Sequence, residues 1–481
     1  MNRVKVAKIS ADGWLILFLG AVFLMYAFIA VMLHIKYQTF GWDLGYFDQL
    51  IWKVSQGIYP LSSLSKVNLL AGHFAPILFL YAPLYWLWSS PYVLLISQAA
   101  IVVFAAYPLY LTAKKITQNI FFSLTVIFSY LFFIGTQWSI LNEFHEATVV
   151  PLFLSLIFYA LSYQKNHWFW VGLVGLLATK EEMALLSAAI GLMLTVYFKN
   201  KKIGLTIAIF SLIWFFYLTE FLLPRISETG ALFHPRLSDT ARTPAELTTQ
   251  IISNPLLVLK SIITPMAKMQ TLFWSLFSFG FLLLAAPLGI LLPLIEQFFM
   301  RFLYTGGQFT VWLNVNHHAA PAAMLLAVAT IYAGPKIVKF VISKTGMRKA
   351  KVYLILGSYL IISTMIQDVY LKAPIHSLLK RNFYQIESYV RDNNMLIEKI
   401  PDSVIVAAQN SLIPHLSQRE KFYLLPEVGE AEFVAVDLND GPNKYAPIDH
   451  DQTEKLISDL ISSGEYQIYF QANRAILLKK I

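Results

Sequence analysis

Two carboxylates lie among aromatic residues in the stretch FGWDLGYFDQLIW, residues 40–52. Asp43 and Asp48 are five residues apart, and on an α-helix this spacing turns their side chains about 140° from one another, so both need not face one site. The surrounding aromatic residues are typical of a membrane interface. A carboxylate pressed into such a belt gains proton affinity and can act as a general base. The alternative for Asp43 is that it caps a surface helix. Asp48 is a candidate for substrate binding.

A second polar cluster is the short acidic segment NEFHE, residues 142–146, which lies between two apolar runs. Glu143 and His145 are candidates for substrate binding, and they could also ligate a divalent metal ion. The segment does not have the metalloprotease spacing, because Val149 stands four residues after His145 where that motif has a second histidine.

Three further groups of ionisable residues interrupt or border apolar runs, a position in which such residues are candidates for function. The sequence KEE at residues 180–182 contributes Lys180 and Glu181 to a predicted substrate site; an ion pair that only orders the turn is the alternative. His73 is a candidate for substrate binding, and the alternative is that it caps a helix or packs in the core. His317 and His318 could bind a metal or an anionic ligand, or could cap a helix.

Several kinds of chemistry have no support in the sequence. The chain has no cysteine, which excludes disulfides, thiolate metal sites and cysteine nucleophiles. It contains no phosphate-binding GxxxxGK[ST] loop and no GxGxxG fingerprint. It also has no Gly-x-Ser-x-Gly elbow of the hydrolase type. Nucleotide hydrolysis, dinucleotide chemistry and serine hydrolysis are therefore not expected.

The composition predicts a polytopic membrane protein. Hydrophobic residues make up 57% of the 481 residues, charged residues 14%, and the mean hydropathy is +0.58, whereas soluble domains carry about 25% charged residues. The net charge of +9 comes from short clusters of lysine and arginine between apolar runs. This distribution is the positive-inside pattern of membrane proteins, so we expect membrane lipids and not nucleic acid as partners.

Apolar runs predict about eleven transmembrane helices. The first run lacks a small-residue cleavage site and is interpreted as a retained helix. A further run at 75–89 contains two prolines and is expected to be re-entrant or to lie along the surface. The runs with membrane length are 14–34, 92–113, 119–139, 147–163, 203–223, 318–335 and 352–371, and shorter ones occur at 167–179, 183–198, 271–286 and 288–300.

The basic clusters predict the orientation. Lysines and arginines near residues 3–8, 114–115, 199–202 and 336–351 all fall on one side if the N-terminus is cytoplasmic. The first loop, 35–91, and the tail then lie outside the cytoplasm, at the plasma membrane, together with the polar clusters named above. Outer-face arginines could hold a phosphate; these are Arg225, Arg236, Arg242 and Arg301.

The sequence divides into residues 1–371, a transmembrane domain, and residues 372–481, a soluble extracytoplasmic α/β domain. The tail carries an amphipathic helical pattern at 380–399 and a second helical pattern at 451–463. Strand patterns occur around 422–425 and 433–437, and 466–470 with 475–478 is typical of a hairpin. No internal repeat is visible.

Five dispersed motifs resemble a known family. They are GWDLGYFDQLIW (41–52), GHFAP (72–76), NEFH (142–145), KEE (180–182) and HLSQR (415–419), and in this order they resemble the membrane family called domain of unknown function 2079. That family is grouped with the GT-C glycosyltransferases, which take a sugar from a polyprenyl-phosphate carrier on the outer face and use an aspartate in the first outer loop. Asp43 matches that position by location. The chain lacks the Asp-Glu or Glu-Asp pair that many GT-C enzymes carry there.

The resemblance implies a GT-C-like membrane glycosyltransferase of the cell envelope. A polyprenyl-phosphate-linked sugar would be the donor, Asp43 the base, and Lys180 with an outer arginine, or a metal near Glu143 and His145, would meet the phosphate. The alternative is a transporter or lipid flippase. Transporters favour inverted repeats and sites at the bilayer midplane, whereas here the polar residues gather on one predicted face.

Overall fold

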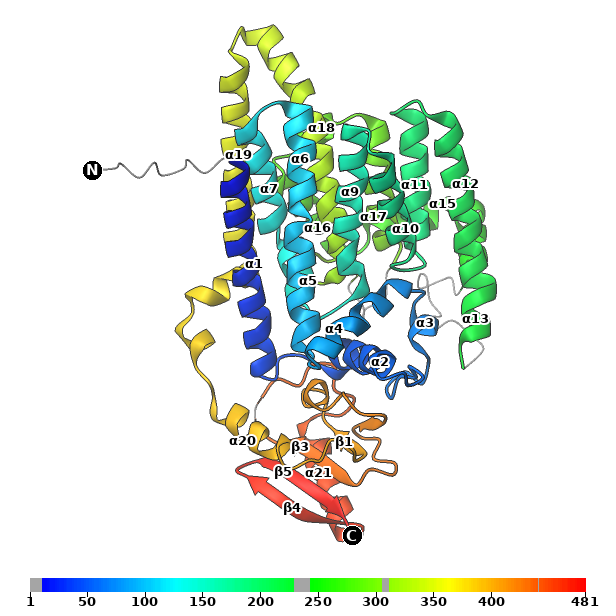
Figure 1. Ribbon diagram of the computed structural model, residues 1–481, viewed down its shortest axis with the longest axis vertical. Coiled ribbons are helices and arrows are strands. Elements are labelled where there is room, and N and C mark those ends of the chain that lie inside the picture. Colours follow the sequence, from blue (N-terminus) through cyan, green and yellow to red (C-terminus); the bar gives the residue numbers. More distant parts are fainter. Residues whose placement is uncertain (1–10, 229–242, 305–310, 440) are drawn as a thin grey trace, which may run out of the picture.

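The computed structural model describes residues 11–228, 243–304, 311–439 and 441–481. A bundle of mostly long, apolar helices forms its larger part (Figure 1). The helices of the bundle are α1 (Ala11–Ile35), α5 (Tyr92–Phe104), α6 (Ala106–Thr117), α7 (Ile120–Phe132), α8 (Ile134–Leu141), α9 (Val150–Tyr163), α10 (Asn166–Leu177), α11 (Met183–Val196), α12 (Lys201–Tyr217), α16 (Ala267–Ser278), α17 (Leu288–Leu303), α18 (Ala320–Thr345) and α19 (Lys349–Tyr370). Short helices α13 (Leu223–Ile226), α14 (Pro244–Ser253) and α15 (Pro255–Ile263) follow α12.

Every predicted apolar run contains helix, which confirms a polytopic helical membrane protein. Six continuous helical segments of the described chain are long and apolar enough to cross a membrane, or up to eight segments if each of two bent pairs is one span. The pair α7–α8 bends by 49°, and the pair α15–α16 bends by 65°. The predicted number of about eleven spans is therefore not established, because several of the remaining helices are too short to span alone.

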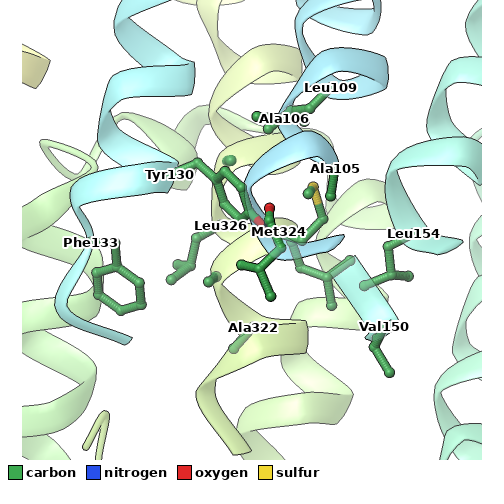
Figure 2. Packing of buried hydrophobic residues seen from close by; sticks show 14 of the residues in the cluster. Ala105, Ala106, Leu109, Tyr130, Phe133, Val150, Leu154, Ala322, Met324 and Leu326 are labelled. Carbon is green, nitrogen blue, oxygen red and sulfur yellow. The ribbon is translucent and has the colours of Figure 1, made fainter. Parts of the chain in front are cut away.

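The core of the bundle is organised around α18. All residues of this helix from Ala320 to Gly334 are buried, and many are alanines, whose small side chains let neighbouring helices approach closely. Figure 2 shows Met324 and Leu326 of α18 between Tyr130 of α7 and Leu154 of α9. The bundle is thus closely packed at its centre, and the polar side chains discussed below lie towards one of its ends.

The connections α6–α7, α11–α12 and α18–α19 lie at the upper end of the bundle in Figure 1. These connections carry basic clusters, including Lys114 and Lys115 in the last turn of α6 and Lys201 and Lys202 in the first turn of α12. The lower end carries the elements of the first loop and the C-terminal strands. The described basic clusters therefore share one end, as predicted; residues 3–8 lie outside the described chain. Which side of the membrane each end faces stays a prediction.

The first loop forms a layer between the bundle and the C-terminal domain. It consists of η1 (Gly41–Gly45), α2 (Tyr46–Ser55), α3 (Leu69–Gly72), η2 (Pro76–Tyr81) and α4 (Ala82–Leu87). The run at 75–89 gives the two short helices η2 and α4, with Pro76 and Pro83 at their first turns, where proline is tolerated.

The C-terminal domain is built on a five-stranded sheet of order β2-β1-β3-β5-β4. Strand β1 is parallel to β2 and β3, whereas β3–β5 and β4–β5 are antiparallel. The predicted strands and hairpin are confirmed, the predicted helix at 380–399 is shorter, and the boundary at residue 372 stays a prediction. The elements are α20 (Ser388–Ile397), β1 (Val406–Ala408), η9 (Ile413–His415), β2 (Phe422–Leu424), β3 (Phe433–Asp437), α21 (His450–Ser462), β4 (Tyr466–Ala472) and β5 (Ala475–Lys480).

Candidate functional site

Asp43 lies on a single π-helical turn, η1, directly after the extended residue Phe40. The carboxylate of Glu143 accepts hydrogen bonds from the backbone N–H groups of Phe40, at 2.7 Å, and of Leu44, at 3.1 Å. A carboxylate at the start of a helical turn satisfies N–H groups that have no partner within the turn. Glu143 therefore performs the capping, and Asp43 lies inside the turn with 28% of its side chain exposed.

The C-terminal domain holds the same turn from its other face. The backbone N–H of Gly41 donates to the backbone oxygen and to the side-chain Oδ1 of Asn410, both at 2.9 Å. A Cβ on Gly41 would lie 2.8 Å from that Oδ1, and a Cβ on Gly45 would lie 2.8 Å from Cγ2 of Ile413. Both glycines are needed because η9 and its flanking residues approach the backbone of the turn too closely for a side chain.

Asp43 of this turn forms a cluster with three histidines. Nε2 of His145 lies 3.5 Å from Oδ1 of Asp43, which is longer than a normal hydrogen bond. The ring of His145 stacks on that of His317 with 3.3 Å between centroids. The centroids of the His317 and His318 rings are 4.0 Å apart. Nε2 of His145 and Nδ1 of His317 are buried and have no hydrogen-bond partner in the described chain. Buried polar atoms without partners mark positions where a ligand or water can bind.

Lys180 is buried beside this cluster among acidic side chains. Its Nζ lies 3.7 Å from Glu146 and 3.4 Å from Glu182. Burial lowers the pKa of Lys180, but the charges of Glu182, Glu146 and Glu181 outweigh it and raise the pKa above its usual value. Lys180 is therefore charged, and its charge is offset by neighbouring carboxylates. Oε2 of Glu146 is buried and has no hydrogen-bond partner in the part of the chain that is described.

Glu181 and His73 form a separate pair. Nδ1 of His73 lies 2.8 Å from Oε1 of Glu181, and the backbone N–H of Phe74 donates to Oε2 at 3.0 Å. Burial raises the pKa of Glu181, but His73 and Lys180 outweigh it, so the pKa falls to about 2. This pair joins the first loop to the turn between α10 and α11. His73 is also within electrostatic range of His318, so the pair borders the histidine cluster.

Asp48 belongs to a different network. Its side chain is fully buried and accepts hydrogen bonds from Tyr85 at 2.7 Å, Ser417 at 2.6 Å and Gln418 at 3.1 Å. Burial raises the pKa of Asp48 to about 6, although these three hydrogen bonds lower it. Asp48 thus links α2, α4 and the C-terminal domain, and its predicted role in substrate binding has no support in this geometry.

The predicted metal site has no fitting ligand set. Oε2 of Glu143 already accepts two backbone hydrogen bonds. In the described ranges, no three histidine, aspartate or glutamate side chains are placed to hold one metal ion. The metal near Glu143 and His145 therefore stays a prediction.

The structure describes two of the four candidate arginines. Arg301 donates to the backbone oxygens of residues 311–313 and to Asn314, and these contacts orient the segment that leads to His317. Arg236 and Arg242 lie outside the described residues. Arg225 lies in the last turn of α13.

The sequence suggests that the tail binds the acceptor or covers the site, but it does not identify the residues by which the C-terminal domain contacts the first loop. Asn410 holds the Asp43 turn, and Ser417 and Gln418 hold Asp48. The last two belong to the HLSQR segment, whose presence among the shared motifs was a signal. Asn410 carried no such signal, because a lone asparagine after a short strand is typical of any turn.

Comparisons with known proteins agree with this architecture. A family model described as "Predicted membrane protein (DUF2079)" matches residues 33–477. A comparison with the curated proteins gives no match. The crystal structure of ArnT from Cupriavidus metallidurans bound to undecaprenyl phosphate matches with a TM-score of 0.56 and 9% identity, covering 98% of this chain and 99% of that chain. ArnT in the apo state matches with a TM-score of 0.55 and 10% identity, covering 98% of both chains. At this identity the likeness shows the fold.

Proposed function

The chain belongs to the DUF2079 family of membrane proteins and has an ArnT-like fold, and from this premise we propose that it is a membrane glycosyltransferase. It would transfer a sugar from a polyprenyl-phosphate carrier to an acceptor hydroxyl. The observation that carries the proposal is a cluster in which Asp43 lies 3.5 Å from His145 and the ring of His145 stacks on that of His317. The carrier is proposed because a solved structure with this fold is bound to undecaprenyl phosphate.

Asp43 is the proposed general base. It is partly exposed, and the neighbouring Glu143 is turned towards backbone amides, which leaves the Asp43 carboxylate to accept a proton from the acceptor hydroxyl. As the acceptor oxygen bonds to the anomeric carbon, the bond between that carbon and the carrier phosphate breaks, and the phosphate leaves with the electron pair. Attack opposite the leaving group inverts the anomeric centre. His145 would orient the carboxylate.

Lys180 has a less direct role than the sequence suggested. Its Nζ lies 3.7 Å from Glu146 and 3.4 Å from Glu182. Its positive charge therefore neutralises these carboxylates and is less available to bind a phosphate. We propose that Lys180, Glu181 and His73 stabilise the segments that border the histidine cluster. His317 and His318 of this cluster are the proposed substrate contacts.

We propose that the site and the tail lie outside the cytoplasm, at the plasma membrane. The proposal rests on the described basic clusters at the opposite end of the bundle and on the positive-inside rule. A lipid-linked donor present in the same membrane would then reach the site from the bilayer, and no nucleotide-binding motif would be needed.

The test of the proposed base is Asp43→Asn. Asparagine keeps the size of aspartate but cannot accept a proton at neutral pH, so transfer should fall by about 10²–10⁴-fold. The assay follows loss of sugar from polyprenyl-phosphate donors in membranes that contain each variant. Asp451→Asn, an exposed position on α21, is the matched control; Asp48 is unsuitable because it is a buried structural contact.

Equal transfer by wild type and Asp43→Asn would remove Asp43 as the base. If the wild-type protein turned over no donor across a range of sugars, the glycosyltransferase proposal itself would fail, and the transporter or flippase alternative would take its place.

A further inference from the structure

A loop of the C-terminal domain, residues 443–445, lies against the Asp43 turn. The side chain of Asn410 donates from Nδ2 to the backbone oxygen of Lys444 at 2.6 Å, while its Oδ1 accepts from Gly41 at 2.9 Å. The backbone N–H of Ser411 donates to the side chain of Asn443 at 3.2 Å. One buried amide therefore connects the turn that carries Asp43 with the loop that carries Lys444.

The backbone of this loop is held in an unusual conformation. Tyr445 has φ of +57°, in the left-handed region that bulky residues rarely adopt. Its ring lies edge-on to the ring of Phe40, with 6.4 Å between the ring centroids, although 68% of Tyr445 is exposed. Backbone strain of this kind persists where the surrounding structure holds it, and it concentrates at ligand-binding sites.

The loop lies close enough to the turn for its charges and those of the turn to act on one another. Partial desolvation and the carboxylates of Asp43 and Glu143 raise the pKa of Tyr445. Burial and Asp43 raise the pKa of Glu143, whereas two backbone hydrogen bonds and the positive charge of Lys444 act against them. Lys444 therefore lies within electrostatic range of Glu143, whose carboxylate holds the Asp43 turn.

Lys180 is paired with carboxylates, because its Nζ lies 3.7 Å from Glu146 and 3.4 Å from Glu182. Lys444 is exposed, and within the described ranges no carboxylate lies within ion-pair distance of it. It differs in this respect from Lys66, Lys114 and Lys421, which have acidic partners. An exposed lysine without an acidic partner, beside a site with several carboxylates, is suited to meet an incoming anion.

We propose that Lys444 is a substrate-binding residue that recognises a phosphate group at the Asp43 site, and that Asn410 is the positioning residue that holds the Lys444 loop against the Asp43 turn. The inference rests on the proposed function and deepens it, because it names the group that the C-terminal domain contributes. The phosphate belongs either to a polyprenyl carrier or to a soluble ligand, and the experiment separates these two sources.

The experiment uses the purified full-length protein in nanodiscs of phosphatidylcholine. Binding of undecaprenyl phosphate is compared with binding of undecaprenol, which has the same chain but no phosphate, and inorganic phosphate is tested as a separate ligand. The variants are Lys444→Ala, Lys444→Arg and, as the matched control, Lys455→Ala. Lys455 is an equally exposed lysine on α21 of the same domain.

Lys444→Ala should weaken phosphate binding about tenfold, the worth of one hydrogen bond to a charged group. Undecaprenol binding should not change, and Lys444→Arg should restore most of the loss. A loss confined to undecaprenyl phosphate assigns the phosphate to the carrier, and a matching loss for inorganic phosphate assigns it to a soluble ligand; either result supports the cation role.

Three outcomes overturn the inference, and they differ in what else they refute. If wild type prefers undecaprenyl phosphate to undecaprenol and Lys444→Ala binds as wild type does, the role of Lys444 is refuted and the glycosyltransferase proposal stands. An equal loss in Lys455→Ala also refutes it, since the effect would then be one of general surface charge. If wild type binds neither undecaprenyl phosphate nor inorganic phosphate, both the inference and the proposed carrier are refuted.

Discussion

Replacing Asp48 by asparagine should change how the stability of the junction between the first loop and the C-terminal domain depends on pH. The side chain is fully buried, and three groups donate to it, from Tyr85, Ser417 and Gln418. Asparagine fills the same space but does not titrate. The comparison between wild type and Asp48→Asn therefore isolates the proton that Asp48 binds.

The magnitude follows from the pKa of Asp48, which burial raises from 3.8 to about 6. Between about pH 4 and 6 the folded protein holds this proton and the unfolded chain has lost it. The stabilising contribution is therefore fully present below about pH 4 and is lost as the pH rises through about 6. Each pKa unit is worth about 1.4 kcal/mol, so the ionised carboxylate at pH 7 costs the folded state about 3 kcal/mol.

A second group in the same junction has the opposite pH dependence. Burial lowers the pKa of His415 from 6.5 to about 4, so its contribution to stability is lost as the pH falls from about 6.5 through 4. The two contributions of Asp48 and His415 therefore oppose one another in wild type. The His415 contribution is present in Asp48→Asn as well, so it cancels in the difference between the two proteins.

Urea unfolding of the full-length protein in detergent, at several pH values from 4 to 7.5, measures this difference. The chain has no native cysteine, so a dye on Ser463→Cys, at an exposed position of the C-terminal domain, reports on that domain alone. The free energy of unfolding of wild type minus that of Asp48→Asn should rise by about 3 kcal/mol from pH 7 to 4. Parallel pH profiles of the two proteins would refute the reasoning.

Two further predictions concern the same junction and the orientation of the chain. Gly45→Ala places a Cβ 2.8 Å from Cγ2 of Ile413 and should cost about 1–3 kcal/mol in thermal unfolding. In a double-mutant cycle the cost of Gly45→Ala should be smaller in an Ile413→Ala background than in wild type, and an equal cost in both backgrounds would mean that the contact is not the cause. A reporter active only outside the cytoplasm, fused after Ile481, should be active, and inactivity would reverse the proposed orientation.

The helical membrane fold and the strands of the tail could be predicted from the sequence because both depend on local patterns. Apolar length identifies bundle helices, and alternation with turn residues identifies strands such as β3 at Phe433–Asp437. The number of spans could not be fixed in this way. A short helix such as α10, with 12 residues, is apolar enough to be buried, and its length leaves open whether it crosses a membrane.

The residues of the site could be predicted from the sequence only in part. Asp43, His145 and Glu143 could be identified because ionisable side chains among apolar runs are conspicuous. Their actual partners could not, because the contact between Gly41 and Asn410 joins residues 369 positions apart and leaves no periodic signal. The pairing of Asp48 with Ser417 was hidden in the same way, so a buried structural carboxylate and a site carboxylate looked alike in the sequence.

The distance along the chain between Gly41 and Asn410 has a consequence for biosynthesis. The 369 positions between them mean that the ribosome has made most of the protein before the residue that holds the Asp43 turn exists. Until then the Gly41 N–H lacks its asparagine partner, and the turn is fixed from one face only, by Glu143. An unfinished or prematurely terminated chain would therefore enter the membrane with its helices in place and its site unassembled, and only completion of the tail would make the protein competent.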